Sequence, residues 1–215
     1  MIEKVSPEQE TPVSLYSHNG SPLLFVISGP SGVGKDSVVR RMKERGFPVQ
    51  FVVTATDRPP RPGEVPGRDY LFCTTAEFER MIAEGELLEY ARVYGEYKGI
   101  PKAHVRQALG SGQDVVLRLD VQGARTVKAL IPEAVTIFLI CESEDELVVR
   151  LQERHTESEE VIRCRLAIAR EEMNYIGEFD YVVMNRRHHL DEAVDDVMAI
   201  VRAEHCRSVP RRICL

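Results

Sequence analysis

The sequence contains no apolar run approaching the roughly 20 residues of a membrane-spanning helix, so no membrane association is expected. Positive charge is not in excess either: 28 lysines and arginines against 34 acidic residues give a formal net charge of −6, which argues against a nucleic-acid-binding surface. The five cysteines are odd in number and contain no Cys-x-x-Cys pair, which argues against a disulfide framework or a zinc site. The first residues resemble neither a signal peptide nor a transit peptide. We therefore predict a cytoplasmic protein, and a mature organellar form whose transit peptide has been removed is the open alternative.

Apolar residues are abundant: they make up 43% of the 215 residues, enough for one domain with small appended lobes. Apolar, strand-like runs alternate with helical patterns along most of the chain. The predicted strands are 23–27, 50–55, 114–120, 136–140 and 180–184, and the predicted helices are 37–43, 123 onward, 143–154, 159–174 and 190–203. This alternation predicts an α/β fold with three layers, in which a parallel sheet core has helices on both faces.

A proline-rich stretch interrupts this alternation. Residues 56–64 contain too many prolines for a helix or a central strand, and strand-like, helical and strand-like segments follow at 69–73, 75–83 and 87–93. We predict a small mixed α/β lobe at 57–105, inserted between the core segments 22–56 and 106–206 of one domain. Residues 1–21 are predicted to be a mobile leader, and residues 207–215 a frayed tail.

A glycine-rich segment lies between the first predicted strand and the first predicted helix. It consists of Gly29, Pro30, Ser31, Gly32, Val33, Gly34, Lys35, Asp36 and Ser37. The spacing matches a phosphate-binding loop, in which backbone N–H groups surround an anion at a helix N-terminus and the lysine reaches the outer phosphates. A tight turn without a ligand is the plainer alternative. The combination of strand, loop and helix favours binding of a nucleoside triphosphate, with the helix dipole adding to the attraction.

Asp36 departs from that pattern, because the residue after the lysine is normally a serine or threonine whose hydroxyl holds a magnesium ion. Magnesium prefers hard oxygen ligands, so a carboxylate can serve directly or through a water molecule. We predict that Asp36 takes part in binding Mg²⁺. The alternative is an acid of the first helical turn that only complements the helix dipole.

Arginines gather in two places: Arg58 and Arg61 on the proline-rich stretch, and Arg150, Arg154 and Arg165 around a polar stretch near 154–160. Phosphoryl transfer is catalysed mainly by positioned cations, so two such groups could clamp a donor and an acceptor phosphate. The alternative is ordinary surface charge, as in an i,i+4 pair of Glu146 with Arg150.

Several motifs together resemble the guanylate kinases over about residues 22–205. Besides the glycine-rich loop, they are Arg58-Pro-Pro-Arg61-Pro-Gly63-Glu64, Gly67-Arg68-Asp69-Tyr70, Leu88-Glu89-Tyr90, Leu119-Asp120-Val121-Gln122-Gly123 and Arg165-Leu166. The resemblance implies Mg²⁺-dependent transfer of the γ-phosphoryl group of ATP to GMP, giving ADP and GDP. It also implies a P-loop fold in which the inserted lobe binds GMP and a short lid at about 152–164 closes, in a monomer or a homodimer.

The same resemblance implies roles for individual residues. The loop residues 29–37 would hold ATP, with Asn185 near the adenine. Thr54, Arg58, Arg61, Tyr70, Glu89 and Asp120 would bind GMP, and Lys35, Arg61, Arg154 and Arg165 would be catalytic. The physics of the base agrees, because guanine presents N–H donors at N1 and N2 and a carboxylate only accepts.

Two departures from the family pattern accompany Asp36. Residues 97–101 replace a Tyr-Gly-Ser or Tyr-Gly-Thr motif, so we predict that Lys98 supplies the phosphate contact and that Ile100 leaves one base contact missing. Arg118 stands where a carboxylate is often found. These variants resemble the plastid and cyanobacterial branch of the family.

Two other functions were weighed against GMP phosphorylation. Ribose 1,5-bisphosphate phosphokinase shares the fold and the Gly-Lys-Asp-Ser sequence found here at 34–37. Its substrate has no base, so a carboxylate such as Glu89 would have nothing to bind. A catalytically dead binding module would have lost Lys35, which is present here.

Overall fold

The computed structural model describes residues 20–61, 63–93, 95–153 and 159–215. Most of the predicted leader therefore lies outside the described residues. The same holds for Arg154 and the neighbouring part of the predicted lid.

A five-stranded sheet forms the centre of the molecule, and all of its strand pairs are parallel. In spatial order the strands are β2 (Val49–Phe51), β7 (Asp114–Arg118), β1 (Leu24–Ser28), β8 (Val135–Ile140) and β9 (Tyr181–Met184). Each of β1, β7 and β8 reads as a nearly continuous apolar run, which is typical of strands covered on both faces.

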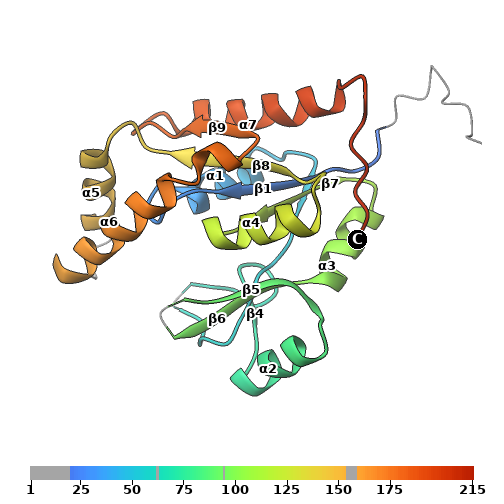
Figure 1. The fold of residues 1–215 in the computed structure, drawn as a ribbon, viewed down its shortest axis with the longest axis horizontal. Coiled ribbons are helices and arrows are strands. Elements are labelled where there is room, and N and C mark those ends of the chain that lie inside the picture. The colour runs from blue at the N-terminus through green and yellow to red at the C-terminus, as the bar shows by residue number, and fades with distance from the viewer. Residues whose placement is uncertain (1–19, 62, 94, 154–158) are drawn as a thin grey trace, which may run out of the picture.

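Helices cover both faces of this sheet, so the predicted three-layer α/β fold is confirmed (Figure 1). One face packs against α1 (Lys35–Glu44), α5 (Glu144–Gln152), α6 (Glu159–Met173) and α7 (Leu190–His205). The other packs against α3 (Lys102–Gly110) and α4 (Val121–Leu130). Phe25 and Ile27 of β1 enter the first core, and Leu24 and Val26 enter the second, because successive side chains of a strand point to opposite faces.

A second, four-stranded sheet forms the inserted lobe, which hangs below α4 in Figure 1. Its order is β4 (Leu71–Phe72), β3 (Ala55–Thr56), β6 (Glu96–Pro101) and β5 (Leu87–Val93), with α2 (Thr75–Ala83) packed on it. Thr74 caps α2 in a capping box with Glu77. Phe78 of α2 is fully buried and stacks on Tyr97 with ring centroids 5.0 Å apart.

The prediction of a single strand at 50–55 is wrong, because this run contributes to two sheets. It pairs with β7 as β2, leaves the core sheet after Val52, and resumes as β3 in the lobe. Strand β6, which pairs with β5 through a turn at Gly95 (φ 84°), is not among the predicted strands. A short apolar run indicates that a segment is buried. It does not indicate which strands the segment pairs with, because those strands are distant in sequence.

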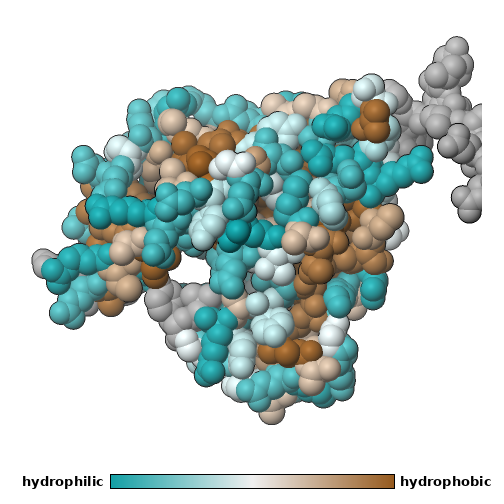
Figure 2. Space-filling model, in the orientation of Figure 1, coloured by the Kyte–Doolittle hydropathy of each residue, from teal (hydrophilic) through white to brown (hydrophobic). Residues whose placement is uncertain are grey.

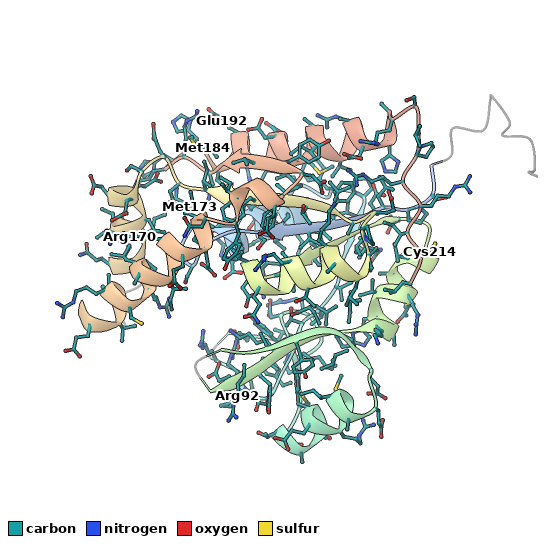
Figure 3. The ribbon with its side chains drawn as sticks, viewed as in Figure 1. Arg92, Arg170, Met173, Met184, Glu192 and Cys214 are labelled. Carbon is teal, nitrogen blue, oxygen red and sulfur yellow. The ribbon has the colours of Figure 1, made fainter. Side chains whose placement is uncertain are left out.

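The tail after α7 has no regular secondary structure, but it lies against the core instead of fraying. Arg211 Nε donates a 2.8 Å hydrogen bond to Glu204 Oε2, and Glu204 is only 2% exposed. Ile213 packs against the core that α3 and α4 cover, and Figure 3 shows Cys214 next to α3. A buried carboxylate needs a cationic partner, and this requirement holds the tail in place.

Candidate active site

The glycine-rich segment joins β1 to α1, as predicted. Gly29 (φ 132°) lies against the backbone of Leu139, and Gly34 (φ 95°) lies against the side chain of Asn185, so that a Cβ at either position would collide. Both positions therefore require glycine. Helix α1 begins at Lys35, so its first backbone N–H groups face the loop and form a site for an anion.

Lys35 folds back over this loop. Its Nζ donates to the carbonyl oxygens of Gly29 and Pro30, the second at 3.0 Å. Removal from water lowers the pKa of Lys35, and the nearby carboxylates of Glu172 and Asp36 oppose that shift. A cation held within the loop by uncharged carbonyls is suited to bind phosphate oxygens.

A polar brace supports the loop from behind. Arg150 Nη1 and Asn185 Nδ2 donate to the carbonyl oxygen of Val33 at 3.0 and 2.8 Å, and Arg150 Nη2 donates to the Asn185 carbonyl at 2.6 Å. Arg150 also pairs with Glu146, so the predicted i,i+4 pair exists, but it is largely buried and not a surface pair. Asn185, predicted to approach adenine, is 4% exposed and uses its amide group in this brace.

Glu172 of α6 is a site residue that the sequence analysis missed. Its carboxylate lies near Lys35 and the backbone N–H of Ser31, and its buried Oε2 has no hydrogen-bond partner among the described residues. Burial raises the pKa of Glu172, and the charge of Lys35 partly offsets this effect. No local pattern in the helix identifies this residue, because its position depends on how α6 packs against the loop.

Two carboxylates come together between the lobe and the core, as predicted. Glu89 of β5 is 7% exposed, and Asp120 caps α4 by accepting a 2.7 Å hydrogen bond from the Gly123 N–H. A Cβ on Gly123 would lie 2.8 Å from Glu89 Oε2 and 3.3 Å from Asp120 Oδ1, so both carboxylates lie beside the first turn of α4. Burial, with a smaller contribution from the charge of Asp120, raises the pKa of Glu89 to about 8. A buried carboxylate of this kind is suited to accept hydrogen bonds from a ligand.

The proline-rich arm is held by an ion pair. Arg58 is 5% exposed and donates from both terminal nitrogens to Glu64, at 2.7 and 2.6 Å. Glu64 also accepts from the Arg61 N–H at 2.8 Å, and the hydrogen bonds from Arg58 lower the pKa of Glu64 to about 2. The guanidinium of Arg58 lies 4.7 Å from the ring centroid of Tyr70. Thus the predicted residues Arg58 and Tyr70 are in contact, while Arg61 is exposed at the surface of the arm.

Asp36, predicted to bind the metal ion, forms an ion pair with Arg118 at the end of β7. Arg118 Nη2 also donates a 2.9 Å hydrogen bond to the hydroxyl of Tyr70. Asp36 and Arg118 are separate departures from the family pattern in the sequence, and their contact is visible only in the fold. Within the described parts of the chain, no group of three His, Cys, Asp or Glu side chains could hold a metal ion.

The remaining predicted residues lie around these features. Thr54 is 8% exposed, where the chain passes from β2 to β3. Lys98 is half-buried on β6, and Arg165 is half-buried on α6. Ile100 is fully buried in the core beneath α3 and α4, so its side chain has a packing role in place of a base contact.

The site opens between the lobe and the core. Figure 2 shows an opening between the lobe and the end of the core formed by α5 and α6. The loop with Lys35 follows β1 and Asp120 follows β7, at the carboxyl ends of two core strands, while Glu89 lies on β5 of the lobe. Ligands of open α/β sheets bind at such an edge. No helix of the described residues is both long and apolar enough to cross a membrane.

Fold and glycine-rich loop together define a P-loop phosphotransferase.

Comparison with known proteins identifies the family within this class. A family model described as guanylate kinase matches residues 21–204. Guanylate kinase 2, chloroplastic/mitochondrial, of Oryza sativa subsp. japonica is 51% identical over 193 residues, which cover 89% of this chain and 68% of that protein. The guanylate kinase of Nocardia farcinica is 50% identical over 173 residues, covering 80% and 90% of the two chains. The crystal structure of guanylate kinase from Anaplasma phagocytophilum matches with a TM-score of 0.72 at 29% identity, covering 88% of this chain and 89% of that one. The chain therefore belongs to the guanylate kinase family and has its ATP:GMP phosphotransferase activity.

Proposed function

We propose that the loop at 29–37 binds ATP, that the inserted lobe binds GMP, and that the γ-phosphoryl group passes between them with Mg²⁺ on the ATP phosphates. The observation that carries this assignment is the pairing of the buried Glu89 with the half-buried Asp120, whose charge also acts on Lys35 of the loop. A base with two N–H donors suits this pair, and the interaction of Asp120 with Lys35 supports one shared site for both reactants.

The donor side depends on Lys35 and the backbone of the loop. The N–H groups at the start of α1 and the ammonium group would hold the β- and γ-phosphates, and the brace from Arg150 and Asn185 would keep the loop in shape. Glu172 lies near Lys35 and Ser31 in this region, so incoming phosphate would meet the charge of that carboxylate.

The acceptor side depends on Glu89, which would accept from guanine N1–H and N2–H while Asp120 accepts from the same edge or orients it. Adenine has an acceptor at N1, so the pair would select guanine. Because Glu89 has a raised pKa, GMP would bind best to the ionised carboxylate, and binding would release a proton.

Kinases generally need a divalent metal ion, which neutralises charge on the β- and γ-phosphates when bound. Magnesium usually takes only one or two protein oxygens and keeps several water ligands. The first turn of α1 offers the carboxylate of Asp36 for this purpose, shared with Arg118. We therefore assign Asp36 a contact to the metal through water, not a place in a protein cage.

Arg61, Arg154 and Arg165 remain proposed catalytic cations that would approach the transferring group when the lobe and the lid close. Arg58 and Lys98 remain proposed contacts to GMP, and Thr54 a proposed hydroxyl for the base. For Arg58 this requires that a phosphate share its guanidinium with Glu64.

The compartment is also a proposal. The free cysteines among the described residues fit an enzyme of the cytoplasm, where thiols stay reduced. They would fit an organelle with a reducing interior equally well. The printed name of the rice relative refers to chloroplasts and mitochondria, so import of a longer form of this chain is the alternative.

A coupled assay with ATP and one acceptor at a time tests the proposed substrates. We expect phosphorylation of GMP, much weaker activity with AMP and dTMP, and none with ribose 1,5-bisphosphate, which has no base for Glu89 to bind. Equal activity with AMP and GMP would remove the role of the carboxylate pair. Turnover of ribose 1,5-bisphosphate in preference to GMP would support the alternative kinase, and no turnover of any acceptor would support a binding module.

A further inference from the structure

Arg118 lies at the point where the core meets the inserted lobe. It ends β7, beside Ile27 at the end of β1, and its side chain is 26% exposed. One terminal nitrogen, Nη1, contacts Asp36 in the first turn of α1, next to Lys35. The other, Nη2, donates a 2.9 Å hydrogen bond to the hydroxyl of Tyr70 in the lobe. A single guanidinium thus connects the helix of the phosphate loop to the lobe.

The surroundings of Tyr70 are rich in positive charge. The Cζ atoms of Arg58 and Arg118 lie 4.7 and 5.5 Å from its ring centroid. Arg58 is matched by Glu64 through two hydrogen bonds in a nearly buried pair, whereas the partner of Arg118, Asp36, is 60% exposed. An exposed carboxylate is well solvated and screens its partner less than a buried one. Arg118 therefore keeps more of its attraction for a second anion than Arg58 does.

The position of Arg118 along the chain indicates which anion this arginine binds. Arg118 and Asp120 are two residues apart, so they are roughly 7 Å apart along the extended chain. Asp120 faces Glu89 and the proposed base site, while Arg118 faces Tyr70. A guanidinium has five N–H donors, and one at each terminal nitrogen is used in these two contacts, so donors remain for phosphate oxygens.

We propose that Arg118 binds the phosphate group of the acceptor nucleotide together with Tyr70, and that Asp36 is a positioning residue that holds Arg118 between loop and lobe. This inference rests on the proposed function of the lobe as the GMP site. It explains the departures at positions 36 and 118 together, since the acid that departs from the loop pattern supports the arginine that binds the acceptor.

The test compares GMP with guanosine, which has the same base and no phosphate. Binding of guanosine and binding of GMP are both measured in the absence of ATP and metal for wild type, Arg118→Gln and Glu89→Gln. We expect Arg118→Gln to weaken GMP binding about 10- to 100-fold, the range for a lost charge-assisted hydrogen bond, and to leave guanosine binding unchanged. Glu89→Gln should weaken both ligands. The KM for ATP should change less than about twofold in Arg118→Gln, and Arg118→Lys should restore part of the GMP affinity.

The other outcomes have definite meanings. Equal loss of GMP and guanosine binding in Arg118→Gln, or no loss of either, overturns the role of Arg118. A wild type that binds no GMP refutes the proposed function itself and is thereby distinguished from failure of this inference. For Asp36, we expect Asp36→Asn to weaken GMP binding in the wild-type background and to have no further effect in the Arg118→Gln background. An equal effect in both backgrounds overturns the positioning role.

Discussion

Glu89 is expected to reduce the stability of the protein in exchange for recognition of GMP. Its side chain is 7% exposed, and its pKa is raised from 4.5 to about 8. Because the pKa of the folded state lies above that of the unfolded state, the folded protein binds more protons between these values. The free energy of unfolding must then fall as the pH rises from about 4.5 to about 8.

The size of the effect follows from the shift. At 1.36 kcal/mol per pKa unit, ionisation of Glu89 costs about 3 kcal/mol at pH 7 and about 5 kcal/mol well above pH 8. Glutamine has nearly the same shape and no charge to desolvate. We therefore expect Glu89→Gln to be as stable as wild type near pH 4.5 and more stable by these amounts at higher pH.

Urea unfolding at about pH 5, 7 and 9 measures the difference between the two proteins. Glu79→Gln is the matched control, because Glu79 is exposed on α2 in the same lobe and its replacement should change stability by less than about 0.5 kcal/mol at every pH. If Glu89→Gln is no more stable than wild type at pH 9, or if its advantage does not grow with pH, the carboxylate is not desolvated and the reasoning is refuted.

The functional half of this prediction concerns GMP. In Glu89→Gln the KM for GMP should rise about 10- to 100-fold while the KM for ATP stays nearly constant, since one charge-assisted pair to the base is lost. In wild type the KM for GMP should fall by up to about tenfold per pH unit between pH 6 and 8, as Glu89 ionises. The variant should keep only the pH dependence contributed by the nucleotide phosphate. Identical pH profiles for the two proteins would contradict the proposed contact.

The other predictions concern the loop, the metal ion, the arm and closure. Lys35→Met should fold normally and lose activity by orders of magnitude; near-normal turnover would exclude a catalytic lysine. Asp36→Ala should require more Mg²⁺ for half-maximal rate, and an unchanged midpoint would leave Asp36 only its contact with Arg118. Glu64→Gln should lower the free energy of unfolding by about 1–3 kcal/mol at pH 7, because the buried Arg58 would keep only its longer ion pair with Glu96, and urea unfolding would show it. A bisubstrate analogue should make the protein more compact in solution scattering, and an unchanged radius of gyration would argue against closure of lobe and lid.

Much of the architecture was readable from local patterns. Apolar runs such as 23–27 and 136–140 identify buried strands, because covering a strand on both faces removes the polar alternation that would otherwise appear. The phosphate loop is equally local, since glycine spacing and a following lysine are enough to form an anion site at a helix start. The pairing of Glu89 with Asp120 was expected only through resemblance to a family.

Tertiary structure decided everything that depends on groups distant in sequence. The run at 50–55 divides between two sheets, the brace of Arg150 and Asn185 closes behind the loop, and the tail docks through Arg211. Asp36 and Arg118 are 82 residues apart, and only the fold shows that they share a contact. The raised pKa of Glu89 also depends on the fold, because packing of the lobe against the core removes water from this carboxylate. The sequence alone determined which chemical groups are present, whereas the fold determined their partners and their exposure to water, because both depend on segments brought together only when the chain is folded.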